Sequence, residues 1–275
     1  MASFSIGDFS IGQGHPLVLI AGPCVIESRD LVMETAEYLK KLADDLGIPL
    51  IFKSSYDKAN RSSKNSFRGP GLYEGLRILS DVKEAFELPL LSDVHRFEEI
   101  DAACEVLDVV QVPAFLCRQT DFITEIAEKS RVVNIKKGQF LAPWDVENII
   151  EKVRGVGNER VIITERGYTF GYNNLVADMG SLAIMRRSGF PVVFDATHSV
   201  QLPGGQGSSS GGDREMALAL SRSAVACGVD GLFLEVHPHP EEALCDGPNS
   251  LSFSALPRLL AVLKEIDAII RKDQA

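Results

Sequence analysis

Residues 16–23, Pro-Leu-Val-Leu-Ile-Ala-Gly-Pro, form a short, continuously apolar run that is followed at once by Cys24. Seven further apolar runs, most of them closing on polar or charged residues, lie at residues 49–55, 89–94, 109–115, 132–138, 160–167, 191–198 and 231–238. Such runs are typical of parallel strands buried on both faces, and the segments between them carry helical periodicity. Eight strands alternating with helices predict an α/β fold of the (β/α)8 TIM-barrel type.

The length of the chain fits one barrel. At 275 residues it is close to the ~250 residues typical of this fold, so residues 1–275 are predicted to form a single domain. The repeated Phe-Ser-Ile-Gly of residues 4–7 and 9–12 predicts a β-hairpin within residues 1–14, as a cap on the end of the barrel away from the site. Ser28 and Gly47 suit the two ends of the first helix.

Composition excludes several classes of partner. A net charge of −10 disfavours nucleic acid and anionic membranes, which attract basic surfaces. No run of 18 or more apolar residues occurs, and the first residues do not resemble a signal segment, so a cytoplasmic protein is expected. Five cysteines are few and odd in number, which does not indicate a disulfide framework.

The carboxyl ends of the predicted strands carry residues capable of chemistry. In barrels of this type the active site lies at those ends. The residues on or just after them are Cys24, Lys53, Asp93, Lys136, Arg166, His198 and Glu235. The sequence therefore predicts where the site lies.

Cations at strand ends of an acidic protein indicate an anionic substrate, most simply a phosphate. Those on or just after strand ends are Lys53, Lys58, Arg61, Lys136 and Arg166. Arg61 with Asn60 and Ser62 offers charged and neutral donors for one phosphate. Lys136 and Arg166, on neighbouring strands, could hold a second anion that bears a carboxylate. For any single cation, a solvated surface charge is the alternative interpretation.

Metal-ligand residue types form a second group. Cys24, His198 and Glu235 belong to the first, seventh and eighth strands, which are contiguous in a closed barrel, and Asp246 lies in the loop beyond. A thiolate, an imidazole and two carboxylates suit zinc, ferrous iron or manganese, with room for water or substrate. The alternative is a buried cysteine beside a hydrogen-bonded histidine.

Two further features adjoin the predicted mouth of the barrel. Asp93 and His95, at the third strand, could transfer a proton or bind a hydroxyl group. Residues 200–213 are rich in Gly and Ser and follow the seventh strand, where a mobile loop could close over substrate. A disordered insertion is the alternative for this loop.

The motifs of the chain match, in order, those of a known family. The main matching strings are AGPCVIES (21–28), FKSSYDKANRSS (52–63), SFRGPG (66–71), QVPAFLCRQTD (111–121), NIKKGQF (134–140), DATHS (195–199), EVHP (235–238) and CDGP (245–248). On these strings the chain resembles the 3-deoxy-D-manno-octulosonate 8-phosphate (Kdo-8-phosphate) synthases along essentially its whole length. The resemblance implies a transferase that condenses phosphoenolpyruvate with D-arabinose 5-phosphate and water, in lipopolysaccharide biosynthesis.

The resemblance also implies roles for individual residues. Phosphoenolpyruvate would be bound by Lys53, Lys58, Gln111, Ala114, Lys136 and Arg166. The sugar phosphate would be bound by Asn60, Arg61 and Ser62, with Asp93 and His95 nearer its hydroxyls and aldehyde. The residues implied in catalysis are Lys58, Asp93, His95, Lys136, His198 and Asp246. Phe115 and Arg118 would reach the site of a neighbouring subunit, which implies a homotetramer.

The family has a metal-dependent and a metal-free branch, and the chain carries marks of both. Metal-free members have asparagine where this chain has Cys24, whereas the CDGP string at 245–248 resembles the metal-free branch. Cys24 has the greater weight, because asparagine cannot replace a thiolate ligand. A divalent metal held by Cys24, His198, Glu235 and Asp246 is therefore expected.

Two other interpretations stay open. A 3-deoxy-D-arabino-heptulosonate 7-phosphate synthase, which uses erythrose 4-phosphate, shares the barrel and the GPC string, but typically has a KPRTS-type loop where this chain has KANRSS. A non-catalytic phosphosugar-binding barrel would be expected to have lost some of the residues named above. Turnover with both substrates distinguishes these interpretations.

Overall fold

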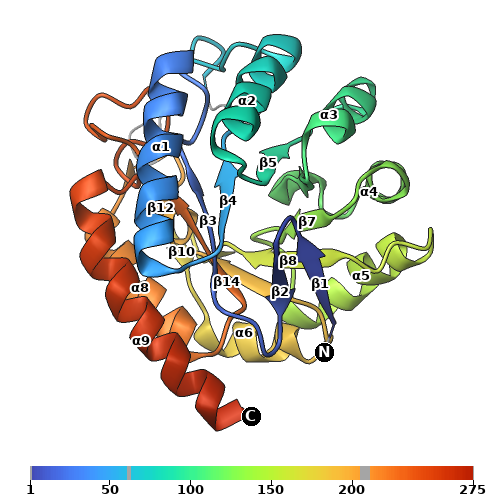
Figure 1. Ribbon diagram of the computed structural model, residues 1–275. Coiled ribbons are helices and arrows are strands. Elements are labelled where there is room, and N and C mark those ends of the chain that lie inside the picture. Colours follow the sequence, from blue (N-terminus) through green and yellow to red (C-terminus); the bar gives the residue numbers. More distant parts are fainter. Residues whose placement is uncertain (1, 61–62, 205–210, 275) are drawn as a thin grey trace.

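Eight parallel strands close into a barrel in the computed structural model, which describes residues 2–60, 63–204 and 211–274 (Figure 1). The strands are β3 (Val18–Gly22), β4 (Leu50–Lys53), β5 (Leu90–Asp93), β6 (Val109–Val112), β7 (Val133–Lys136), β8 (Val161–Glu165), β11 (Val192–Asp195) and β14 (Gly231–Glu235). Each lies inside one of the eight apolar runs, so the predicted (β/α)8 barrel is confirmed. β14 pairs with β3 and with β11, which brings the first, seventh and eighth barrel strands side by side.

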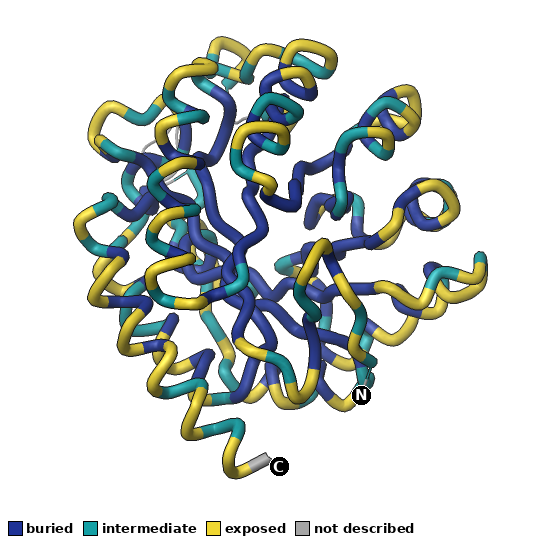
Figure 2. Tube along the Cα trace, viewed as in Figure 1, coloured by how far each residue is buried: buried dark blue, intermediate teal, exposed yellow. Residues whose placement is uncertain are grey.

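Both faces of the strands are buried, which explains their continuous apolar character. One set of side chains, including Val18, Ile51 and Phe233, fills the inside of the barrel. The alternate set, including Leu19 and Phe52, packs against the surrounding helices. Figure 2 shows the buried barrel wall and the exposed outer faces of the helices around it.

The helices occupy the intervals between the strands. They are α1 (Arg29–Leu46), α2 (Leu72–Phe86), α3 (Ile100–Val106), α4 (Thr120–Lys129), α5 (Val146–Arg154), α6 (Met179–Arg186), α7 (Ala196–Ser199), α8 (Arg214–Ala226) and α9 (Leu256–Gln274). Ser28 accepts a hydrogen bond from the backbone amide of Leu31, and Gly47 has a left-handed φ of 62°. These are the cap roles predicted for Ser28 and Gly47. None of the described helices is both long enough and apolar enough to span a membrane.

The predicted N-terminal hairpin is present. β1 (Ser3–Ile6) and β2 (Phe9–Gly12) pair antiparallel. Ile6 and Ile11 are buried in the same cluster as Val18 and Val109, which begin their strands. The hairpin therefore covers the amino ends of the barrel strands and leaves the opposite end to the site.

Two short strand pairs and a 3-10 helix shape the loops at the carboxyl ends. β9 (Tyr168–Thr169) pairs with β10 (Leu175–Val176), and β12 (Gln201–Leu202) pairs with β13 (Gly211–Gly212). The Gly- and Ser-rich loop thus has a paired strand at each end, while residues 205–210 lie outside the described residues. The 3-10 helix η2 (Ala114–Leu116) directly follows β6.

Candidate active site

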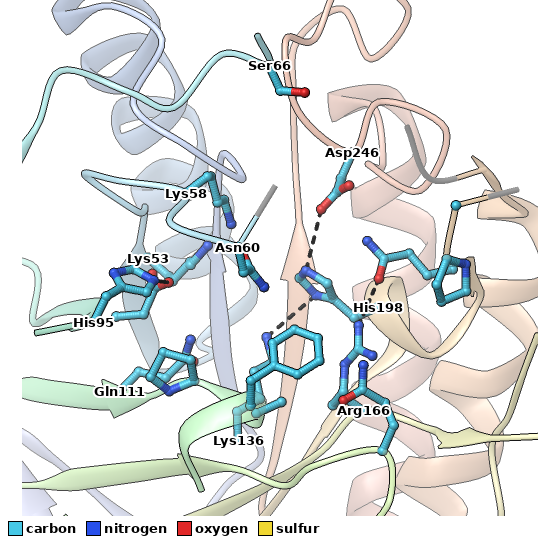
Figure 3. Close-up of a pocket in the computed structure, with 18 of the residues that line it drawn as sticks. Lys53, Lys58, Asn60, Ser66, His95, Gln111, Lys136, Arg166, His198 and Asp246 are labelled. Atoms are coloured by element: carbon cyan, nitrogen blue, oxygen red, sulfur yellow. Dashed lines mark hydrogen bonds and ion pairs between the residues drawn. The ribbon is translucent and has the colours of Figure 1, made fainter. Parts of the chain in front are cut away.

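A cavity of about 420 Å³ opens at the carboxyl ends of the barrel strands (Figure 3). The predicted site residues that line it are Lys53, Lys58, Asn60, Asp93, His95, Gln111, Ala114, Phe115, Lys136, Arg166, His198 and Asp246. They come from opposite sides of the barrel, as the labelled side chains in Figure 3 show. The alternation of strands and helices therefore brings distant parts of the sequence to one place.

Other predicted site residues lie elsewhere. Cys24 and Glu235 are 4% and 0% exposed and are not part of the cavity wall. Arg118 lines a separate, more open cavity of about 550 Å³ together with His95 and Phe97. Arg61 and Ser62 lie outside the described residues.

Positively charged side chains lie at the bottom of the cavity. Lys53, Lys136 and Arg166 are each less than 10% exposed although each carries a charged group. Arg166 donates from Nη2 to Gln201 Oε1 at 2.8 Å, whereas its Nη1 is buried with no hydrogen-bond partner among the described residues. An unused, buried guanidinium nitrogen suits a bound carboxylate or phosphate, because burying it without a partner is costly.

Lys136 has an apolar and an anionic neighbour. Its Nζ lies 3.8 Å from the centre of the Phe233 ring and 2.5 Å from Asp195 Oδ2. Burial is the largest influence and lowers the pKa of Lys136, while Asp195 opposes this shift. The proton on Lys136 is therefore held less tightly than that of an exposed lysine.

Lys58 lies near the edge of the cavity bottom. Its side chain is 11% exposed, and its Nζ lies 3.9 Å from Glu235 Oε1. Burial alone would lower the pKa of Lys58, but the nearby Cys24, Cys245 and Glu235 raise it well above its ordinary value. Lys58 therefore stays protonated and available to an anion.

Asp93 and His95 form a direct pair. His95 Nε2 lies 3.0 Å from Asp93 Oδ2, and Asp93 also accepts a hydrogen bond from the hydroxyl of Ser55. Burial lowers the pKa of His95, but Asp93, followed by Glu99, outweighs it and leaves the pKa raised. Burial alone would raise the pKa of Asp93, but His95 and then Lys58 and Lys53 outweigh burial and hold this pKa well below its usual range. The pair is thus arranged as imidazolium and carboxylate.

Glu99 supports this pair and was not predicted. One oxygen of Glu99, Oε2, accepts from the hydroxyl of Tyr56 and from the backbone amide of His95, each at 2.9 Å. Both Tyr56 and Glu99 are buried. Tyr56 follows directly on the second apolar run but was not selected, and Glu99 stands at no strand end in the sequence.

His198 corrects one detail of the sequence analysis. It was predicted to end the seventh strand, but β11 ends at Asp195 and His198 lies in the short helix α7. The side chain of Asp195 accepts from the backbone amide of His198 at 2.9 Å and so caps α7. The cap ends the strand three residues earlier than predicted.

Asp195 was also missed as a site residue. Its Oδ2 lies 2.7 Å from His198 Nδ1, in addition to the contact with Lys136. Burial alone would raise the pKa of Asp195, but His198 and Lys136 hold it far below its ordinary value. One carboxylate therefore fixes both a cation of the cavity base and an imidazole. The DATHS string contained the signal, but only His198 was selected from it.

Three of the four predicted metal ligands, His198, Glu235 and Asp246, form one group whose candidate ligand atoms lie within 4.8 Å of one another. The fourth, Cys24, belongs to a second such group with Asp246 and with Cys245, which was not predicted as a ligand. Both oxygens of Glu235 are fully buried and lack a hydrogen-bond partner among the described residues, although Oε1 lies 3.5 Å from Lys53 Nζ and 3.4 Å from His198 Nε2. A buried carboxylate without hydrogen bonds beside an imidazole fits a divalent cation.

Ten residues of the cavity wall were not selected individually. They are Ser66, Pro113, Gln139, Gln201, Pro203, Gly204, Ala243, Leu244, Gly247 and Pro248. Three of them, at positions 201, 203 and 204, belong to the 200–213 loop that was predicted to lie beside the mouth of the barrel. Most of the others lie within the family-like strings, which were the only signal for them, because a polar or small loop residue carries no periodic pattern.

Comparison with known proteins places this geometry in a family. A model described as the DAHP synthetase I family matches residues 2–272. The chain is 62% identical over 267 residues to the 2-dehydro-3-deoxyphosphooctonate aldolase of Geobacter sulfurreducens, with 97% of this chain and 98% of the relative covered. The proteins of the same name from Geobacter metallireducens and Trichlorobacter lovleyi are 63% and 61% identical, with the same coverage.

Proposed function

Because this chain belongs to the DAHP synthetase I family and groups with its 2-dehydro-3-deoxyphosphooctonate aldolases (Kdo-8-phosphate synthases), we propose that it condenses phosphoenolpyruvate with D-arabinose 5-phosphate and water. The products are 3-deoxy-D-manno-octulosonate 8-phosphate and inorganic phosphate, so the enzyme is a C–C bond-forming transferase of lipopolysaccharide biosynthesis. The convergence of Lys53, Lys58, Lys136 and Arg166 on one cavity carries this conclusion. So many cations in one small space suit two anionic substrates.

The two alternatives are not favoured. Relatives that cover 97–98% of the chain at 58–63% identity are named 2-dehydro-3-deoxyphosphooctonate aldolase. None of these relatives carries the name of the erythrose 4-phosphate enzyme. A non-catalytic barrel has no need of a preserved Asp93–His95 pair beside the cations. Turnover is therefore the property to expect.

Binding follows from the placement of charge. Lys136 and Arg166 face the cavity from adjacent strands and hold phosphoenolpyruvate, with Lys53 and Lys58 beside them. Asn60, which lines the cavity, belongs to the loop that holds the sugar phosphate, together with Arg61 and Ser62. Holding two mutually repelling anions in contact supplies both orientation and charge stabilisation.

The first chemical step joins C3 of phosphoenolpyruvate to the aldehyde carbon of the sugar. Negative charge develops on the aldehyde oxygen, which becomes a hydroxyl group. His95, kept cationic by Asp93 at 3.0 Å, stabilises that charge or provides the proton. Asp93 acts here as the partner that maintains the charge of the imidazole.

The second step adds water at C2 and expels phosphate by C–O cleavage. The leaving phosphate needs a proton or a cation at the oxygen that departs. Lys136, whose pKa is lowered by burial, is suited to donate a proton there, and Asp195 at 2.5 Å holds its Nζ in place. This is general acid catalysis.

A divalent metal, zinc, ferrous iron or manganese, is the proposed cofactor, held by Cys24, His198, Glu235 and Asp246. Such an ion supplies Lewis-acid activation of the water or the aldehyde. The buried oxygens of Glu235, which lack hydrogen-bond partners among the described residues, support this proposal. Asp195 orients His198 through Nδ1 and leaves Nε2 toward Glu235 and Asp246, at 3.4 and 3.7 Å. That is the usual arrangement of a metal-binding histidine.

The loop of residues 200–213 is proposed to close over the substrates. Gln201, Pro203 and Gly204 line the cavity, and Gln201 accepts a hydrogen bond from Arg166 at 2.8 Å. A closure that moved Gln201 would release a donor of Arg166 to substrate. The loop would thus couple coverage of the cavity to anion binding.

The proposed assembly is a cytoplasmic homotetramer. Phe115 lines the cavity yet is 57% exposed, so a neighbouring subunit that covered it would complete the rim. Arg118 lines the more open cavity beyond, which supports a role at the site of a neighbouring subunit. Light scattering of the full-length protein tests the assembly, and mixing Arg118→Ala with an inactive variant tests for shared sites.

The function is tested by phosphate release from phosphoenolpyruvate with arabinose 5-phosphate, and with erythrose 4-phosphate as the matched alternative. Preference for the five-carbon sugar supports the proposal, and preference for erythrose 4-phosphate contradicts it. The same assay after treatment with a chelator, and after addition of single divalent metals, tests the cofactor. Activity that is indifferent to chelation would keep the reaction and remove the metal.

A further inference from the structure

Two cysteines from opposite ends of the chain meet beside the cavity. Cys24 Sγ and Cys245 Sγ lie 2.7 Å apart although 221 positions separate them in the sequence. Both side chains are buried, at 4% and 2% exposure. The contact joins the loop after β3 to the loop that carries Asp246. These two loops follow adjacent barrel strands, β3 and β14, so the two thiols lie together beside the proposed metal position.

Asp246 connects the thiols to the remaining ligands. Its Oδ2 lies 3.5 Å from Cys24 Sγ and 3.7 Å from His198 Nε2. The group of three that contains Cys24 includes Cys245, whereas the other group contains neither thiol. A cation that reached Cys24 and Asp246 together would therefore meet Cys245 as well.

The backbone at Asp246 is arranged to present two consecutive side chains. Its φ of 49° is in the left-handed region, which residues other than glycine rarely adopt. In an extended segment, side chains of successive residues point to opposite sides. Here Cys245 and Asp246 both contribute to one cluster of ligand atoms. Strained backbone of this kind tends to persist at functional sites.

We infer that Cys245 supplies a second thiolate to the divalent metal, alongside Cys24, and that the site consequently selects thiophilic ions such as zinc over manganese. The inference rests on the metal site proposed above and adds a residue to it. Soft sulfur ligands favour zinc, whereas oxygen ligands suit manganese and magnesium. The buried carboxylate of Glu235, which has no hydrogen-bond partner among the described residues, then completes a mixed sulfur, nitrogen and oxygen set.

Sulfur counting by zinc X-ray absorption on the full-length protein tests the inference directly. We expect one zinc per chain with two sulfur neighbours at about 2.3 Å, and one sulfur neighbour in Cys245→Ser. Cys227→Ser, at the end of α8, is the matched control and should keep two. A single sulfur neighbour of zinc in the wild-type protein overturns the inference. This measurement does not depend on whether any variant folds.

The same samples separate this inference from the proposed reaction. Wild-type protein that turns over both substrates but binds no zinc would overturn the second thiolate and keep the synthase. Two sulfurs per zinc without turnover would support the second thiolate and remove the reaction. Competition between zinc and manganese provides an independent measure: Cys245→Ser should lose part of the preference for zinc, and an unchanged preference counts against the inference.

Discussion

Lys137 Nζ lies 3.3 Å from Glu165 Oε2, and both side chains are completely buried outside the cavity. Each is the sequence neighbour of a cavity residue, because Lys137 follows Lys136 and Glu165 precedes Arg166. Lys137 also donates to the carbonyls of Gly138 and Leu141, at 3.0 and 3.1 Å. This pair therefore ties the ends of β7 and β8 together directly behind the proposed anion site.

Replacing one partner of this pair should destabilise the fold. Lys137→Met leaves the buried Glu165 carboxylate without its cation, and breaking a buried pair in this way costs about 3–5 kcal/mol. The double variant Lys137→Met/Glu165→Gln should lose less than the single one, because no buried charge remains. Urea unfolding measures both. Lys129→Met, which removes two surface ion pairs, with Glu125 on α4 and Asp101 on α3, is the control and should change the unfolding free energy much less.

The protonation of His95 should depend on Asp93. In the folded protein the pKa of His95 lies above its ordinary value because Asp93 and Glu99 outweigh burial. A raised pKa means that this group stabilises the fold fully below its unfolded pKa of about 6.5, and that the contribution disappears as pH rises through the folded pKa. NMR titration of His95 should show a lower pKa in Asp93→Asn. Asp101→Asn, an exposed change on α3, should leave it unchanged; equal pKa values in all three proteins would contradict the pairing.

Arg166 should act mainly on phosphoenolpyruvate. Arg166→Ala removes a buried guanidinium whose Nη1 has no protein partner among the described residues. Loss of a charge-assisted hydrogen bond should lower kcat/KM for phosphoenolpyruvate about 10- to 100-fold. Steady-state kinetics with each substrate varied in turn measures this effect. Arg187→Ala, at the exposed end of α6, is the control, and an equal loss there would count against a role for Arg166 in binding.

Gly22 should tolerate no side chain. A Cβ at this position would lie 2.0 Å from the backbone carbonyl oxygen of Lys53, so Gly22→Ala must displace β4 at the cavity base. We expect reduced stability together with a higher KM for phosphoenolpyruvate. Gly14→Ala separates this clash from the cost of backbone conformation, because Gly14 has a φ of 88° and open space around it. Its cost should be about 1–2 kcal/mol, with normal kinetics.

The barrel and the position of the site could be predicted because both depend on local sequence patterns. A buried parallel strand is apolar throughout, and the fold itself determines that strand ends converge. α2 and α4, for example, lie in intervals between strands where helical periodicity was predicted.

Pairs formed between strands could not be predicted in the same way. Lys136 and Asp195 lie on β7 and β11, with β8 between them, so their contact depends on how side chains cross the mouth of the barrel. Glu99 and Tyr56 were missed for the same reason. Even His198, which was selected correctly as a cavity residue, was placed on the strand because the capping role of Asp195 has no unique sequence signal.

Asp195 should matter more for turnover than for folding. Asp195→Asn keeps a side chain that can cap α7, but it removes the charge shared by Lys136 at 2.5 Å and His198 at 2.7 Å. Lys136 would lose the partner that holds its Nζ in place, and the orientation of His198 would no longer be fixed. Partners of this kind typically account for a 10- to 100-fold change in activity or metal affinity, so we expect kcat to fall by about that factor. Asp178→Asn, which alters the equivalent cap of α6, controls for capping. A comparable loss of kcat in both variants would show that Asp195 acts through the helix rather than through the two side chains it joins.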